Sequence, residues 1–269
     1  MTSRRTVERA GVSLSVTDHA GPGAPVVILH GLAGSSLEME ETARSLAPRR
    51  VLIPDARGHG ASTRRPADVS RQAHVDDVVH VIEALAGEPV TLIGQSMGGH
   101  TALLVAAARP DLVERLILLE AGAGGDGTAE SRIAMRAFFE SWPRPFRDRA
   151  EAQAFLGDSA LGRAWAADLR EESGGLWPRF DVDVMIETIA AVDERPAWDE
   201  WARVTPPTLV VFAADGMFDD AARQALAGRR PDVVRVDLAA GSHDAHLDAF
   251  PQWSEAVRAF LADDGRRSA

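Results

Sequence analysis

Short apolar runs and longer segments with helical spacing alternate along most of the chain. The apolar runs are hydrophobic on both faces, as expected of central parallel strands that are covered by helices. One run near the N-terminus instead alternates apolar and polar residues, which is typical of an edge strand. The pattern predicts strands at residues 12–17 (the edge strand), 25–29, 50–54, 90–93, 116–119, 207–212 and 233–238, and helices at residues 37–46, 72–86, 101–108, 219–227 and 251–261. This alternation predicts an α/β fold with a mostly parallel, doubly wound sheet.

The alternation stops after Glu120, where a glycine-rich connector at residues 121–127 leads into a helical, aromatic segment. We therefore predict a core formed by residues 1–121 and 203–269, and a helical cap formed by residues 122–202. An insertion between strands of such a sheet lies over their carboxyl ends, where ligands bind. Some of its aromatic side chains are expected to line an apolar substrate pocket, and we select Phe138, Trp142, Trp165 and Trp177.

Composition and charge narrow the class of partner. The net charge of −11 argues against nucleic acid or an anionic membrane as the main partner, because both attract a positive face. The chain has no cysteine, which excludes disulfides, thiolate metal sites and a cysteine nucleophile. The arginines near the N-terminus are followed by no apolar segment, and no stretch has the length of a membrane span, so we expect a cytoplasmic protein.

The strongest chemical signal lies between the strand at 90–93 and the helix that follows it. Only Gly94-Gln95-Ser96-Met97-Gly98 separates the two elements, so the chain must turn sharply. Glycine two residues before and two residues after the serine allows strand and helix backbones to approach closely. The serine is left at the apex, and the N–H of Met97 lies at the positive end of the new helix. This arrangement is typical of a nucleophile elbow.

Four separated motifs make the chain resemble the α/β-hydrolase superfamily over nearly its whole length. They are His30-Gly31, Asp55-x-Arg57-Gly58-His59-Gly60-x-Ser62, Gly94-Gln95-Ser96-Met97-Gly98-Gly99 and Gly241-x-His243-x-x-His246-Leu247. The elbow and the Arg-Gly-His-Gly loop are most similar to the branch with esterases, enol-lactonases and cofactor-free haloperoxidases. The resemblance implies the α/β-hydrolase fold and a Ser-His-acid triad.

A serine hydroxyl becomes a good nucleophile only when a neighbouring imidazole takes its proton. The resemblance implies that His243 is this base and that His246, three residues later, is its weaker competitor. It also implies that the N–H of Leu32, after His30-Gly31, joins the Met97 N–H in an oxyanion hole. His30, Gly31 and Gln95 flank these positions and are expected to contact substrate.

The acid departs from the common family pattern. Most relatives carry it after the penultimate strand, a position that falls here on Gly216, with Asp215 one residue early. Some relatives carry it instead after the strand that follows the elbow helix, where this chain has Glu120. We favour Glu120 and keep Asp215 as the alternative.

These residues together predict a cofactor-free, metal-free serine hydrolase of a small, largely apolar ester or lactone, acting as a monomer or homodimer. C–C bond hydrolysis or haloperoxidase-like perhydrolysis would use the same triad. A non-catalytic ligand-binding module on the same fold is the third alternative, favoured if neither carboxylate reaches His243.

Overall fold

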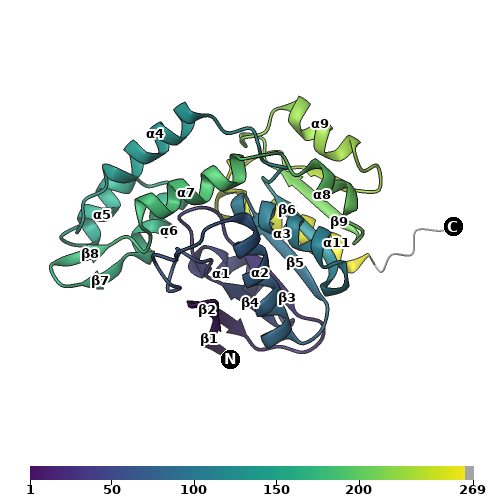
Figure 1. Cartoon of the computed structure of the whole chain (residues 1–269), viewed down its shortest axis with the longest axis horizontal. Helices are drawn as coiled ribbons and strands as arrows, with labels where there is room; N and C mark the ends of the chain where they lie inside the picture. Colours follow the sequence, from purple (N-terminus) through teal and green to yellow (C-terminus); the bar gives the residue numbers. More distant parts are fainter. Residues whose placement is uncertain (264–269) are drawn as a thin grey trace.

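The computed structural model describes residues 1–263, in which one eight-stranded sheet is flanked by helices (Figure 1). The spatial order is β1-β2-β4-β3-β5-β6-β9-β10, and every pairing from β4 onward is parallel, whereas β1, β2 and β4 pair antiparallel. The strands are β1 (Thr2–Arg9), β2 (Val12–His19), β3 (Val26–Leu29), β4 (Val51–Pro54), β5 (Val90–Gln95), β6 (Val113–Leu119), β9 (Thr208–Phe212) and β10 (Val234–Asp237). The predicted fold class, a mostly parallel doubly wound sheet, is confirmed.

The α-helices lie on both faces of the sheet and between β6 and β9 in the chain. They are α1 (Glu40–Ser45), α2 (Arg71–Val81), α3 (Met97–Ala108), α4 (Ala129–Glu140), α5 (Arg149–Leu156), α6 (Ala160–Asp168), α7 (Val182–Asp193), α8 (Trp198–Arg203), α9 (Asp220–Gly228), α10 (Ala245–Asp248) and α11 (Phe250–Ala262). Shorter 3-10 segments at Ser36–Met39 and Pro110–Leu112, and a π-helical turn at Ile82–Ala86, extend three of the connections.

Two apolar clusters hold the helices onto the sheet. Side chains of α2, α3 and α8 pack on one face, and side chains of α1, α10 and α11 pack on the other. Both faces of the central strands are therefore largely buried, which explains why their sequences are mostly apolar. Burial of this kind removes apolar surface from water and is the main stabilising contribution to the fold.

The edge of the sheet differs from the prediction. The strand predicted at the edge, residues 12–17, is β2 and lies between β4 and β1, and the edge strand is β1. The β1 sequence is mostly exposed and rich in arginine, so it lacks the apolar signal by which strands are recognised. Pairing with β2 over its full length, rather than its own composition, makes this segment a strand.

Residues 122–202, which we call the inserted segment, leave the sheet after β6 and return to it before β9 (Figure 1). The segment is mostly helical, but it also contains a two-stranded hairpin, β7 (Arg170–Glu172) and β8 (Gly175–Trp177), that the pattern did not predict. Its aromatic side chains form a third apolar cluster, whereas Trp201 of α8 lies in the cluster under α3. The last helix of the segment therefore packs with the sheet.

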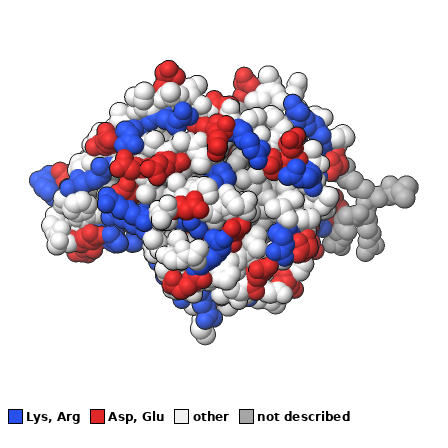
Figure 2. All heavy atoms as spheres, in the orientation of Figure 1, with Lys and Arg blue, Asp and Glu red and all other residues white. Residues whose placement is uncertain are grey.

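Acidic and basic side chains are interspersed over the face drawn in Figure 2. Among residues 1–263, none of the helices combines the length and the apolar character that crossing a membrane requires.

Candidate active site at the ends of strands β5 and β6

Ser96 lies at the turn between β5 and α3 in a conformation that few residues adopt. Its φ of 52° and ψ of −122° are unusual for a residue with a Cβ atom, and such strain concentrates at functional sites. A Cβ at Gly94 or Gly98 would overlap backbone atoms of the neighbouring segments, so both glycines permit the turn. The turn is fixed by hydrogen bonds from the Ser96 N–H to the Leu119 carbonyl (3.0 Å) and from the His100 N–H to the Ser96 carbonyl (3.0 Å).

Glu120 occupies the matching position one strand away, directly after β6. It also has a positive φ, 46°, and its N–H donates to the Val211 carbonyl at 3.0 Å. Its carboxylate is fully buried, and the N–H groups of Ala213 and Met217 donate to Oε1 and Oε2, each at 2.8 Å. Two backbone donors in a buried place are a strong cradle for a negative charge.

His243 completes the cluster from the loop after β10. Its Nδ1 lies 3.4 Å from Glu120 Oε2, and its side chain is 31% exposed. Burial opposes ionisation of Glu120, but the hydrogen bonds from His243 and from the Ala213 and Met217 N–H groups outweigh it and lower the pKa of the carboxyl group. An ionised Glu120 accepts a hydrogen bond from Nδ1–H, which keeps the proton on Nδ1 and leaves Nε2 of the ring as the proton acceptor.

His246, the competitor, is buried within α10. Neither of its ring nitrogens has a hydrogen-bond partner among the described residues, and burial lowers its pKa to about 3. It is therefore a neutral packing residue, remote from solvent.

The two candidate acids have different surroundings. Asp215 is exposed, and its N–H, donating to the Gly241 carbonyl at 2.9 Å, ties the loop after β9 to the loop that carries His243. A Cβ at Gly216, where most relatives have the acid, would overlap the Glu120 carboxylate. The carboxylate of Glu120 thus fills the space that a side chain at Gly216 would otherwise occupy. Of the two candidates, only Glu120 reaches His243 in the described chain.

The predicted oxyanion donors are both free to act. Within residues 1–263, neither the Met97 N–H nor the Leu32 N–H donates a hydrogen bond to another protein group. Met97 is the first residue of α3, so its N–H carries the positive end of the helix. The Ser96 hydroxyl makes no hydrogen bond to His243 among the described residues; such contacts are often long before substrate binds.

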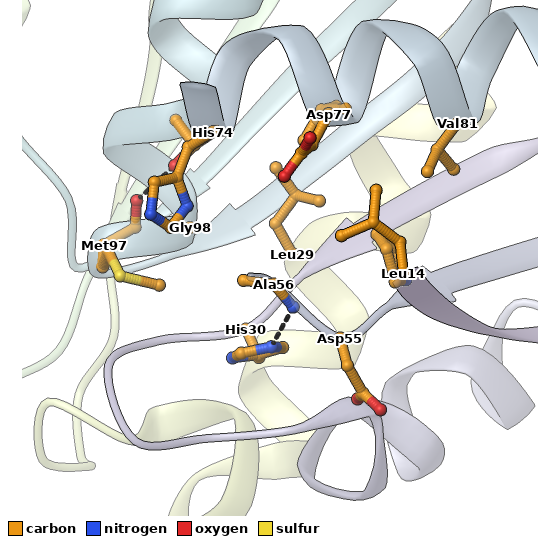
Figure 3. A pocket seen from close by; sticks show the side chains of 13 residues that line it. Leu14, Leu29, His30, Asp55, Ala56, His74, Asp77, Val81, Met97 and Gly98 are labelled. Atoms are coloured by element: carbon orange, nitrogen blue, oxygen red, sulfur yellow. Dashed lines mark hydrogen bonds between the residues drawn. The ribbon is translucent and has the colours of Figure 1, made fainter. Parts of the chain in front are cut away.

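His30, Gly31 and Gln95 form a scaffold around the elbow. Nδ1 of His30 donates to the Gly31 carbonyl at 2.8 Å, and its Nε2 accepts from the Ala56 N–H at 3.0 Å (Figure 3). The Gln95 amide donates to the His243 carbonyl at 3.1 Å, which fixes the histidine loop against the elbow. In this geometry the three residues hold neighbouring loops together, and their contact with substrate stays a prediction.

A small void lies behind the start of α3 (Figure 3). Its volume is about 30 Å³, and apolar side chains of β2, β3 and α2 form much of its wall. A space of this size holds about one water molecule, so it belongs to the packing of the interior and admits no substrate.

A larger cavity of about 370 Å³ opens at Ser96 and Glu120. Its volume lies at the lower end of the range for small-molecule sites. The wall is formed by the glycine-rich connector, the end of α7 and the start of α9, and it is largely apolar. Its apolar members include Ala121, Ala123, Ile189, Val192, Pro196, Trp198, Met217, Phe218, Ala222, Ala225 and Leu226. Most of these residues lie outside any sequence motif, and only the tertiary fold brings them together.

The four aromatic residues selected from the sequence lie elsewhere. Phe138, Trp142 and Trp165 pack on one another, with Trp142 and Trp165 ring centroids 5.2 Å apart, and Trp177 ends the hairpin strand β8. None of the four is among the described residues that line the 370 Å³ cavity. Trp142 and Trp165 instead adjoin Ala33 of the loop after β3. A role for these rings in substrate binding stays a prediction.

Two carboxylates also face the cavity, Asp126 and Asp193, and Asp193 is paired with Arg132 at 3.0 Å. Among the described lining residues there is no arginine. Within residues 1–263, histidine and carboxylate side chains form no group of three that could hold a metal ion.

Comparison with known proteins places the chain in a family. The family model for the alpha/beta hydrolase fold matches residues 24–250. Mouse sn-1-specific diacylglycerol lipase ABHD11 is 29% identical over 252 residues, covering 88% of this chain and 80% of the relative. The 2-(acetamidomethylene)succinate hydrolase of Mesorhizobium japonicum is 28% identical over 250 residues, covering 89% and 88% of the two chains.

Solved structures show the same fold. The crystal structure of E-2-(acetamidomethylene)succinate hydrolase superposes with a TM-score of 0.85 at 23% identity, covering 97% of this chain and 99% of the other. The enol-lactonase of Burkholderia xenovorans superposes with a TM-score of 0.79 at 21% identity, covering 96% and 100%. At these identities the likeness concerns the fold alone.

Proposed function

Because the chain belongs to the alpha/beta hydrolase fold family, we propose that it is a serine hydrolase that cleaves a small, largely apolar ester or lactone. The observation that carries the proposal is the buried Glu120 carboxylate, which accepts two backbone N–H groups at 2.8 Å and faces His243 Nδ1 at 3.4 Å. Ser96, on a strained turn, lines the same cavity as Glu120.

The proposed reaction has two steps, acylation of Ser96 and hydrolysis of the acyl-enzyme, and the same groups act in both. Ser96 Oγ attacks the carbonyl carbon while His243 Nε2 takes the hydroxyl proton, and the carbonyl oxygen becomes an oxyanion held by the Met97 and Leu32 N–H groups. The intermediate collapses, the bond to the alkoxy group breaks, and His243 returns the proton to the departing alcohol. Water then attacks the acyl-enzyme with the same proton path, releasing the acid and restoring the serine. Glu120 holds the ring in the required tautomer and stabilises the imidazolium in both steps.

Charge in the cavity favours a neutral substrate. The relative from Mesorhizobium is named for a succinate derivative, which carries carboxylates, whereas the cavity here presents Asp126 and Asp193 and no arginine among its described lining. An anionic substrate would lose its hydration without gaining a cationic partner. The apolar wall and the volume of about 370 Å³ support a compact hydrocarbon group on the ester. We further propose that residues 122–202 cap the site and that the protein acts without cofactor or metal. Its partner is a small-molecule substrate rather than nucleic acid or a membrane, and the protein is a monomer or homodimer.

The test is covalent labelling with a fluorophosphonate, which traps an activated serine. We expect one adduct by intact mass, located on the Ser96 peptide, and none in Ser96→Ala. Ser141→Ala, which changes an exposed serine at the end of α4, should label as the wild type does. A wild-type protein that resists labelling would instead support a ligand-binding module on this fold.

A further inference from the structure

Arg223 of α9 is nearly buried and lies outside the substrate cavity. Its side chain is 11% exposed, and it is absent from the described cavity wall, to which its neighbours Ala222 and Ala225 contribute. Its guanidinium group donates from Nη2 to the Ala213 carbonyl at 2.7 Å and from Nε to the Phe218 carbonyl at 2.8 Å. One rigid fork therefore grips both ends of the loop formed by residues 213–218.

This loop is the cradle of the Glu120 carboxylate. At one end of the loop, Ala213 contacts both side chains: its carbonyl accepts from Arg223 and its N–H donates to Glu120 Oε1. At the other end, the Met217 N–H that donates to Oε2 lies one residue before the Phe218 carbonyl bound by Arg223. The loop can aim both donors at the carboxylate only while its two ends keep their spacing.

The same loop also contacts the segment that carries His243. The Asp215 N–H donates to the Gly241 carbonyl at 2.9 Å, and Asp215 forms a parallel bridge with Ser242. A change in the loop would therefore act on the acid and on the histidine together. Among the described residues Arg223 makes no hydrogen bond to Ser96, Glu120 or His243, so its hydrogen bonds act on them through this loop.

We propose that Arg223 is a positioning residue, which sets the acid–histidine pair of the hydrolytic site by fixing the loop 213–218. This inference rests on the proposed function, because it assigns the pair to catalysis. Its physical basis is separate: a charged, two-pronged donor binds the loop ends, and charge-assisted hydrogen bonds of this kind are stronger than neutral ones.

Arg235 provides a matched control. Its guanidinium lies over the Phe212 ring at 5.6 Å, as that of Arg223 does at 5.5 Å, and both arginines pair with Asp237. Arg235 makes no hydrogen bond to residues 213–218 among those of the described chain. Replacing either arginine by methionine removes one cation from the same aromatic and acidic neighbours, but only Arg223→Met frees the loop.

The experiment compares ester hydrolysis in Arg223→Met and Arg235→Met, each also placed in a Glu120→Gln background. Arg223→Met should lower kcat by about tenfold, as expected for the loss of about one charge-assisted hydrogen bond, whereas Arg235→Met should change it less than about twofold. In the Glu120→Gln background Arg223→Met should add clearly less than tenfold, because the part of its effect that passes through Glu120 is already lost. Equal kcat in the two arginine variants, or a full tenfold loss in the Glu120→Gln background, would overturn the inference.

Hydrogen exchange provides a readout that needs no activity. The Ala213 and Met217 amides should lose protection from exchange in Arg223→Met and keep it in Arg235→Met. Unchanged protection in both variants would refute the claim that Arg223 fixes the loop. If Ser96→Ala hydrolyses ester as fast as the wild type, the proposed function fails, while the exchange result still decides whether Arg223 fixes the loop. Should Arg223→Met not fold, Arg223→Lys keeps the charge but loses the fork, and an intermediate loss of both kcat and protection is expected.

Discussion

Replacing Glu120 by glutamine tests the identity of the acid. The carboxylate accepts three hydrogen bonds, from the Ala213 N–H, the Met217 N–H and His243 Nδ1. A glutamine of the same shape offers one oxygen and one NH₂ group, so at least one of the three donors faces another donor. A buried donor left unpaired costs about 1–3 kcal/mol of stability.

The catalytic loss follows from the missing charge. When the proton arrives on His243, the imidazolium lies 3.4 Å from a carboxylate oxygen in the wild type. At that separation and an effective dielectric constant of about 20, the attraction is about 5 kcal/mol. Since each 1.36 kcal/mol is tenfold in rate, we expect kcat of Glu120→Gln to fall by roughly 10³- to 10⁴-fold. The same neutral substitution in a serine protease triad costs about 10⁴-fold.

The assay is steady-state hydrolysis of a short-chain p-nitrophenyl ester, with circular dichroism to show that each variant is folded. Asp215→Asn is the matched control, because Asp215 is exposed and its structural tie to Gly241 uses the backbone N–H. It should keep kcat within about twofold of wild type, as surface substitutions usually do. A Glu120→Gln enzyme within tenfold of wild type, or an equal loss in Asp215→Asn, would refute the assignment of the acid.

Three further predictions concern the space around the acid, the cavity and pH. Gly216→Ala places a methyl group against the Glu120 carboxylate and should lower kcat about 100-fold, as a displacement of about 1 Å can. Gly228→Ala, where no atom lies near the added methyl group, should leave kcat unchanged. Hydrolysis of the p-nitrophenyl ester measures both variants, and equal kcat values would contradict the predicted overlap with Glu120. Ile189→Trp narrows the cavity, so kcat/KM for long-chain relative to acetyl esters should fall at least about tenfold. Phe155→Ala, which changes an exposed side chain away from the cavity, should leave the chain-length profile unchanged; an unchanged profile in both variants would remove the cavity from substrate binding. Burial, opposed by Ser35 and Arg179, raises the pKa of Asp168 to about 6 from an ordinary 3.8, so the folded state holds the proton more tightly and loses up to about 3 kcal/mol of stability as pH rises from about 4 to 6. Urea unfolding across this range should show the wild type losing up to about 3 kcal/mol of stability relative to Asp168→Asn as pH rises; parallel curves would refute it.

The elbow could be predicted from the sequence because every determinant is local. Ser96, the flanking glycines, the strand before them and the helix after them lie within twenty residues. The structure places Ser96 between the two elements, although the strand runs to Gln95 rather than residue 93 and the helix begins at Met97 rather than residue 101. The fold class followed from the same kind of local evidence, because strands buried on both faces are mostly apolar.

The acid could be narrowed to two residues but not chosen firmly. The choice depends on the absence of a side chain at Gly216, on backbone donors from a loop almost a hundred residues away in sequence, and on the direction of the Glu120 side chain. The residues next to Glu120 in the sequence reveal none of these features. The sequence did contain one usable sign, a glycine where most relatives carry the acid.

The cavity wall was not predictable for a related reason. Aromatic residues of the inserted segment stand out in the sequence, but they pack mainly on one another, and Ile189, Val192 and Leu226 contribute to the wall without any motif. The edge strand β1 was missed because its exposed, arginine-rich sequence gives no apolar pattern. In both cases contacts with segments distant in the sequence determine the structure.

The central claim is that Ser96 is the nucleophile of an acyl-transfer reaction, and the most direct measurement is p-nitrophenol release from a short-chain ester by wild type and Ser96→Ala. The account predicts turnover by the wild type and loss of that turnover to the background rate in the variant, with the fold unchanged by circular dichroism. An inert wild type, or a variant as active as the wild type, would contradict it.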